Sequence, residues 1–280
     1  MPVKESRSRT PKPRIVPQPI PAHFYPWWLW SGQPTFEGVC VALAQQNAIL
    51  DGLLQPLLVT GTAVGPLDSW RVAVHVAHLT SVADQVVAAA QESPVAPSGL
   101  DAIDWYRRRD PRIAAVVAEA VARVGAGRAV RSGLTDLVLR HRAASATAVA
   151  ILRSGAPGRI LGGPADGLDL AEFTVTRLVE AVVHGLDLAA ALGHPGHVEP
   201  AAANLVSGFL AAVADRGSPD ASAAPIAVDG QGSLIVLSGE RRKARIPAVE
   251  WIHAATGRRP AGDLLPRSHD WLAAGLPLVA

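Results

Sequence analysis

The chain has 280 residues, 49% of them hydrophobic, and its 26 basic and 24 acidic side chains give a net charge of +2. This hydrophobic content at low net charge excludes a disordered chain, and the single cysteine excludes both a disulfide framework and a cysteine-clustered metal site. No stretch approaches the roughly 18 apolar residues of a membrane span, and the N-terminus lacks the apolar core of a secretory signal, so we expect a cytoplasmic protein with no membrane partner.

The first 35 residues are predicted to form an arm of their own. Residues 1–20 are rich in proline and hold five basic side chains against one acidic side chain, so the rest of the chain has a slight acidic excess. A nucleic-acid partner is therefore not expected. Residues 23–30 (HFYPWWLW) contain five of the thirteen aromatic side chains. We expect them to pack as a strap over the edge of the core, with a ligand or subunit surface as the alternative.

Four segments between residues 36 and 197 have the apolar spacing of α-helices. The third is expected to be interrupted near residues 125–127, which read Gly-Ala-Gly. Breaks rich in glycine and proline separate the segments, and four helices joined in this way favour an antiparallel bundle. The predicted helices span about residues 36–58, 68–91, 111–153 and 170–192.

The chain from residue 198 to residue 280 is predicted to form a small α+β domain that packs on the bundle. A helix over about residues 200–214 precedes two apolar strands, which flank the turn sequence DGQG at residues 229–232. A third short strand is expected near residues 244–246, and a last helix over residues 248–256. The overall prediction is a mainly α fold with a small α+β part at its C-terminal end.

The helix predicted over residues 170–192 carries a polar stripe on an otherwise apolar surface. Arg177, Glu180, His184 and Asp187 stand three or four residues apart, which places them along one side of a helix. Charged groups on a buried helix are costly unless they pair with each other or bind a ligand. Glu180 and His184 together offer a carboxylate and an imidazole to one cation. The alternative is a stripe that faces solvent or forms an internal network without a ligand.

The helix predicted over residues 68–91 has a matching polar line, formed by Arg71, His75 and His78. A single histidine in such a place is more often a hydrogen-bonded core residue than a ligand. If the two helices are neighbours, however, one of these histidines joins Glu180 and His184, and three protein ligands leave coordination positions open, as in a reactive metal site. The His-Glu-x-x-His motif and the paired Glu-x-x-His units of di-iron bundles are absent from the sequence, whereas mononuclear iron remains compatible with such ligands.

Two segments resemble the mycothiol-dependent maleylpyruvate isomerase family, which has a DinB-like metalloenzyme fold. The segment WRVAVHVAHL (residues 70–79) resembles the family pattern Trp-x-x-x-Asp-x-x-x-His-Leu, with Val74 in place of the acidic residue. The segment RLVEAVVHGLDLAAALG (residues 177–193) resembles the second signature of the family, and the ending GRRPAGDLLP…LPLV is similar to the close of its C-terminal domain. The resemblance spans most of residues 36–280 and implies a DinB-like four-helix bundle.

The resemblance also implies which residues bind the metal. It assigns a divalent cation, with zinc expected, to His78, Glu180 and His184. His78 is preferred over His75 because it stands eight residues after the tryptophan of the pattern and directly before the leucine.

Further residues are implied around this centre. Arg177 and Asp187 are expected to support the metal ligands or to orient the substrate. In family members an arginine of the C-terminal domain can help to bind a substrate carboxylate, and Arg241, Arg242 and Arg245 are the candidates here.

The activity that the resemblance implies is metal-dependent and uses mycothiol or a similar low-molecular-weight thiol as a cofactor. A cation lowers the pKa of a bound thiol, and the thiolate adds to a small electrophilic substrate, in cis–trans isomerisation or in S-transfer. Cys40 is expected to be a buried small residue rather than the nucleophile. The alternatives are a non-catalytic metal-binding or regulatory protein, and a metal hydrolase or lyase that needs no thiol.

Overall fold

A computed structural model of the chain describes residues 35–59, 66–93, 95–108, 111–217, 226–229, 233–238, 241–260, 262 and 264–265. The predicted arm and aromatic strap, residues 1–35, lie outside this part of the chain except for Thr35.

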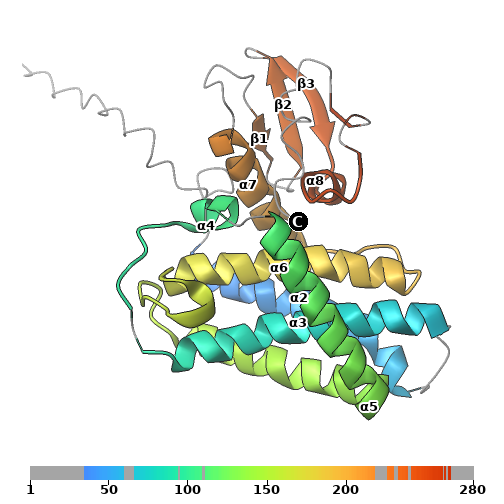
Figure 1. Ribbon diagram of the computed structural model, residues 1–280. Coiled ribbons are helices and arrows are strands. Elements are labelled where there is room, and N and C mark those ends of the chain that lie inside the picture. The colour runs from blue at the N-terminus through green and yellow to red at the C-terminus, as the bar shows by residue number, and fades with distance from the viewer. Residues whose placement is uncertain are drawn as a thin grey trace, which may run out of the picture.

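Four long helices form the predicted bundle (Figure 1). Helix α2 contacts α5 and α6, and α3 contacts the same two helices, so α2 and α3 lie diagonally across the bundle. Its interior is filled by side chains such as Leu50, Val76, Leu152 and Phe173, each fully buried. The mainly α fold is therefore confirmed. The four helices are α2 (Phe36–Val59), α3 (Pro66–Gln91), α5 (Pro111–Ser154) and α6 (Leu170–Ala191).

Helix α5 is broken at a glycine, although not at the predicted one. The interruption expected near residues 125–127 is wrong, because these residues remain helical. Gly133 instead adopts φ 82° and ψ 159°, a conformation open almost only to glycine. Figure 1 shows that the chain reverses sharply here, so that the first half of α5 crosses the outside of the bundle and the second half lies within it.

Two short elements were not predicted from the sequence. Helix α4 (Ala102–Arg108) lies between α3 and α5, and a 3-10 turn, η2 (Gly163–Ala165), precedes α6. Helix α4 is too short for helical spacing to reveal it, but its first turn is fixed by side chains. The Asp101 carboxylate accepts from the Asp104 amide at 2.8 Å, and Glu172 of α6 accepts from the Ala102 amide at 2.9 Å.

The C-terminal part has the predicted mixture of helices and strands. The strands form an antiparallel sheet in the order β1-β2-β3, and the third is longer than predicted. Helix α7 lies between the sheet and the bundle and contacts α2, α4, α6, α8 and β1 (Figure 1). The Trp251 indole of α8 donates to the Ser207 carbonyl of α7 at 3.2 Å. The elements are α7 (Pro200–Gly217), β1 (Ile226–Val228), β2 (Leu234–Ser238), β3 (Arg241–Ile246) and α8 (Ala248–Ala255).

These contacts join the C-terminal part to the bundle in one packed body. The hydrophobic core runs without a break from Phe173 in α6 through Phe209 in α7 to Trp251 in α8. The predicted division into residues 1–35, 36–197 and 198–280 stays a prediction.

Among the described residues one helix is long and apolar enough to cross a membrane, the part of α3 over Arg71–Gln91. This window packs against α5 and α6, and 56% of it is buried inside the protein. A core helix of a bundle passes the same test of length and composition, so this helix does not indicate a membrane protein.

Candidate metal centre

Helix α6 presents a line of polar side chains to its neighbour α3. The helix begins after Asp169, whose carboxylate accepts from the Glu172 amide at 2.8 Å, as a helix N-cap does. Most of its surface is buried against α2, α3 and α7. Because residues three or four apart lie on one side of a helix, Glu180, His184 and Asp187 project together from it.

Three of the predicted site residues converge between α3 and α6. The Nε2 atoms of His78 and His184 lie 3.3 and 3.1 Å from the same oxygen of Glu180, Oε2. The two imidazole centroids are 4.1 Å apart. One nitrogen from each histidine and one carboxylate oxygen all lie within 4.8 Å of one another, which suits ligation of a single cation. The structure thus brings together the residues that the sequence analysis grouped.

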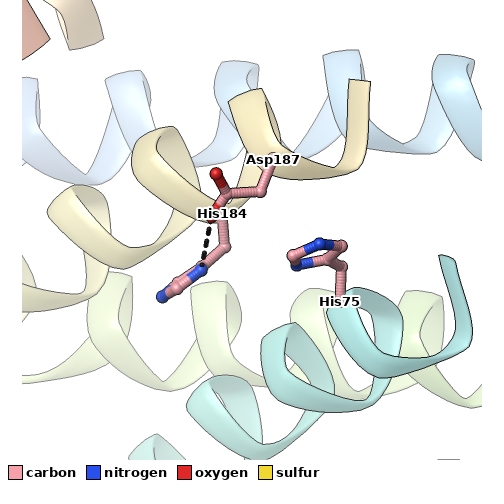
Figure 2. Close-up of side chains that lie close together, drawn as sticks. All are labelled: His75, His184 and Asp187. Atoms are coloured by element: carbon pink, nitrogen blue, oxygen red, sulfur yellow. Dashed lines mark hydrogen bonds and ion pairs between the residues drawn. The ribbon is translucent and has the colours of Figure 1, made fainter. Parts of the chain in front are cut away.

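A carboxylate and an arginine fix the orientation of His184. Its Nδ1 lies 3.1 Å from Oδ2 of Asp187, an interaction drawn in Figure 2. Arg258 holds the same carboxylate with two hydrogen bonds of 2.6 Å, one to each oxygen, and donates a third to the Thr256 carbonyl at 2.9 Å. When Nδ1–H of His184 donates to Asp187, the lone pair of Nε2 faces His78 and Glu180 and is available to a cation.

The second oxygen of Glu180 has a partner from α4. The Tyr106 hydroxyl lies 3.3 Å from Glu180 Oε1 and 3.3 Å from the Thr176 carbonyl, so it can donate to either. Tyr106 is buried and its ring packs edge-on against Phe209 of α7. Sequence reasoning missed this residue, because a single tyrosine in an unpredicted helix carries no pattern.

The electrostatics of the centre are those of a site that holds positive charge. Burial acts to raise the pKa of Glu180, but hydrogen bonds with His184 and His78 and the nearby charge of Arg177 hold it well below its usual range. Burial acts to lower the pKa of His184, but hydrogen bonds with Asp187 and Glu180 raise it to about 9. Burial lowers the pKa of His78. A proton on Nε2 of His184, which faces Glu180, thus supplies positive charge where a cation would bind.

Arg177 is buried inside the bundle, next to the candidate metal centre. Its side chain is buried and stacks on the Phe173 ring, with Cζ 4.6 Å from the centroid. The guanidinium donates to Thr176 Oγ1 at 3.1 Å and to the side-chain carbonyl of Gln85. The arginine also lines a partly open pocket of about 20 Å³ together with His141. This position suits an electrostatic role towards Glu180, so a direct contact with substrate is not the role that the structure favours.

Of the three arginines proposed on β3, the structure describes the side chain of Arg245 alone, so a role for Arg241 or Arg242 stays a prediction. The side chains of Arg241 and Arg242 lie outside the described part of the structure. Arg245 is exposed and donates to Oδ2 of Asp229, which directly follows β1, at 2.8 Å. Among the described residues, an arginine of the C-terminal part that does reach the centre is Arg258, which directly follows Gly257 after the end of α8. The sequence contained one signal for it, the GRRP segment similar to the close of the family's C-terminal domain.

His75 belongs to a second, overlapping group. One ligand atom from each of His75, His184 and Asp187 also lie within 4.8 Å of one another (Figure 2). A neutral imidazole offers only one lone pair, so His184 serves one of the two groups at a time. Asp187 is already held through both oxygens by Arg258, whereas Glu180 faces His78 and His184 directly. The group with His78 is therefore the better cation site.

A DinB-like helical bundle in which two imidazoles and a carboxylate converge defines a class of candidate metal-binding proteins. A family model described as the mycothiol maleylpyruvate isomerase N-terminal domain matches residues 44–189, and the chain belongs to this family. The match covers His78, Glu180, His184 and Asp187 and ends before Arg258. No curated protein and no solved structure matches the chain in the same comparisons.

Proposed function

We propose that this protein is a metal-dependent enzyme that uses mycothiol, or a similar small thiol, to act on an electrophilic substrate. The observation that carries the proposal is the convergence of His78, Glu180 and His184 on one point between α3 and α6. Membership of the family supports a mycothiol-related function.

Zinc is the cation that we propose, held by His78 Nε2, Glu180 Oε2 and His184 Nε2. Two nitrogens and one carboxylate oxygen are donors that zinc prefers, and three protein ligands leave room for a substrate or cofactor. When bound, the cation supplies an open coordination position and lowers the pKa of a thiol placed there.

The chain's own residues hold this arrangement in place. Asp187 and Arg258 orient His184, Tyr106 contacts the second oxygen of Glu180, and the buried charge of Arg177 favours the ionised form of that carboxylate. None of these groups needs to move in order to present the three donor atoms.

The thiol is proposed to come from a cofactor because the protein's own thiol is not available. Cys40 is 2% exposed, and burial raises its pKa, which disfavours the reactive thiolate. Cys40 lies on α2, whereas the candidate ligands lie on α3 and α6.

The reaction that we propose begins with addition of the thiolate to an electron-poor carbon of the substrate. If that carbon belongs to a double bond, the new C–S bond converts the double bond to a single bond about which rotation occurs. Loss of the thiolate then restores the double bond in the other geometry, which is cis–trans isomerisation. If the carbon carries a leaving group, the C–S bond forms as that group departs, which is S-transfer.

The proposed setting follows from the same chemistry. Mycothiol is a low-molecular-weight thiol, and reduced thiols persist in the cytoplasm, where we place the protein. The proposed partner is a small-molecule electrophile, rather than a nucleic acid or a membrane.

Metal analysis of the purified protein tests the proposal. We expect about one zinc per chain in the wild type and a loss of most of it in both His78→Ala and Glu180→Ala, since each removes one ligand. His197→Ala, which removes an exposed histidine outside the centre, is the matched control and should keep its zinc. Unchanged zinc in both ligand variants would exclude this centre.

Turnover of a panel of electrophiles, with and without added thiol, tests the catalytic part. We expect product only with thiol. Zinc without any turnover would favour the non-catalytic metal-binding protein, and activity that survives removal of all small thiols would favour a hydrolase or lyase.

A further inference from the structure

His75 is a polar side chain at the centre that the proposed function leaves without a role. It lies on α3, one turn before His78, and its ring faces His184 and Asp187 across the space between α3 and α6 (Figure 2). Its side chain is partly exposed. Among the described residues it has no hydrogen-bond or ion-pair partner, whereas His78 and His184 both have one.

His75 is not needed to hold the cation. The three donor atoms of His78, Glu180 and His184 already point to one place, and Nδ1 of His184 is engaged by Asp187. A second cation among His75, His184 and Asp187 would have to displace the guanidinium of Arg258 from both carboxylate oxygens. The imidazole is therefore left as a hydrogen-bonding group beside the cation.

The charges around His75 favour an anion as its partner. The carboxylate of Asp187 is neutralised by Arg258, and that of Glu180 by the proposed cation. Arg71, one turn before His75 on α3, is exposed on the same line of the helix. A ligand that enters next to His75 thus meets cationic groups, and an imidazole in any protonation state found in proteins has an N–H to donate.

We propose that His75 is a ligand-binding residue that donates a hydrogen bond to the anionic ligand, a thiolate or a carboxylate, bound at the open position of the cation. The inference rests on the proposed metal centre but not on the proposed thiol. His75 stands one residue after Val74, where the resemblance has an acidic residue.

Cobalt(II) in place of zinc gives a direct measurement, because the visible spectrum of the bound ion reports both metal binding and the replacement of its exogenous ligand. The proteins are the wild type, His75→Ala, His75→Gln, His78→Ala and the control His197→Ala, which removes an exposed histidine outside the centre. Each is titrated with cobalt and then with two probes, 2-mercaptoethanol as a thiol and azide as an anion that is not a thiol.

We expect His75→Ala to bind cobalt with a dissociation constant within about threefold of the wild type, whereas the dissociation constants of both probes rise about tenfold, or 1.4 kcal/mol. His75→Gln should recover most of the probe affinity, because its amide N–H also donates. His197→Ala should keep the cobalt affinity and both probe affinities of the wild type.

Two results would overturn the inference. If His75→Ala loses cobalt as His78→Ala does, His75 is a metal ligand, and if the probe affinities do not change, His75 does not contact the bound anion. Azide distinguishes a failure of this inference from a failure of the proposed thiol chemistry, because it is an anion that is not a thiol. A wild type that binds azide but no thiol would refute the thiol chemistry and leave the role of His75 standing, and a wild type that binds no cobalt would refute both.

Discussion

His184 has two different tasks on its two ring nitrogens. Nδ1 is 3.1 Å from Asp187, and Nε2 is 3.1 Å from Glu180. Without a cation the ring bridges two carboxylates as an imidazolium, which is why its pKa is raised to about 9. A cation that binds at Nε2 must release that proton, so metal uptake by this centre is coupled to pH.

A different histidine links pH to stability. His141 on α5 is 2% exposed, lies 3.5 Å from the Ser145 hydroxyl, and has no hydrogen-bond partner for Nε2 in the described structure. Burial lowers its pKa to about 4, with Asp51 acting in the opposite direction and Arg142 in the same direction. The folded protein therefore keeps His141 neutral over a pH range in which the unfolded chain protonates it.

The sign of the effect follows from proton counting. Between about pH 6.5 and pH 4 the unfolded chain binds one more proton at this position, so acid lowers the free energy of unfolding. We expect the stability advantage of the wild type over His141→Gln to shrink by about 2 to 3 kcal/mol between pH 7 and pH 4.5. Urea unfolding at the two pH values measures it.

His197→Gln, at an exposed position, should follow the wild type across this range. Parallel loss of stability in the wild type and in His141→Gln would contradict the prediction.

At the scale of the element, helical spacing was the informative signal for the candidate centre. Glu180, His184 and Asp187 are separated by four and three residues, and His78 lies on a second apolar helix, so their grouping followed once the two helices were taken as neighbours. Helical spacing does not predict which residues of short or irregular segments lie at the centre. Tyr106 comes from a helix of seven residues and Arg258 from the end of another, so only tertiary structure reveals them.

The limits of local sequence patterns also explain why the break in α5 was predicted at the wrong position. The GAG sequence at residues 125–127 has two glycines, but glycine permits a bend without requiring one. The chain bends at Gly133 because the second half of the helix packs inside the bundle. This packing is a tertiary interaction, which the local sequence does not reveal.

A matched pair of substitutions tests the role of this glycine. An added Cβ meets no atom within 4 Å at Gly133 or at Gly52, so only the backbone differs. Gly133→Ala must adopt a positive φ and should lower the free energy of unfolding by about 1–3 kcal/mol. Gly52→Ala lies within regular helix α2 and should raise it by about 0.5–1 kcal/mol.

Urea unfolding followed by circular dichroism compares the two variants with the wild type. Equal effects of the two substitutions would show that the reversal at residue 133 does not depend on glycine.

At the scale of the whole molecule, the C-terminal part supports the centre in the bundle. Arg258 follows α8, and its two bonds to Asp187 reach the side chain that orients His184. Groups that orient metal ligands in this way typically contribute 10- to 100-fold to metal affinity.

We therefore expect Arg258→Ala to raise the dissociation constant of zinc by about 10- to 100-fold, measured in competition with a chromogenic chelator. Arg258→Lys should recover only part of the affinity, since an ammonium cannot match both carboxylate oxygens in a planar pair. Arg259→Ala is the adjacent control, because Arg259 pairs with Glu250 at 3.2 Å and should leave zinc binding unchanged. Tighter binding in Arg258→Ala would mean that repulsion between the guanidinium and the cation outweighs the orientation of Asp187.

The bond between Arg258 and Asp187 also sets an order of events during synthesis. The ribosome delivers every proposed donor atom by residue 184, but the guanidinium that secures Asp187 leaves the exit tunnel more than 70 residues later. A nascent chain of intermediate length therefore already contains all three proposed ligands. In such a chain His184 can contact Asp187, but Arg258 is not yet present to hold the Asp187 carboxylate in place. The centre is in this sense completed by a segment that is translated after all of its proposed ligands.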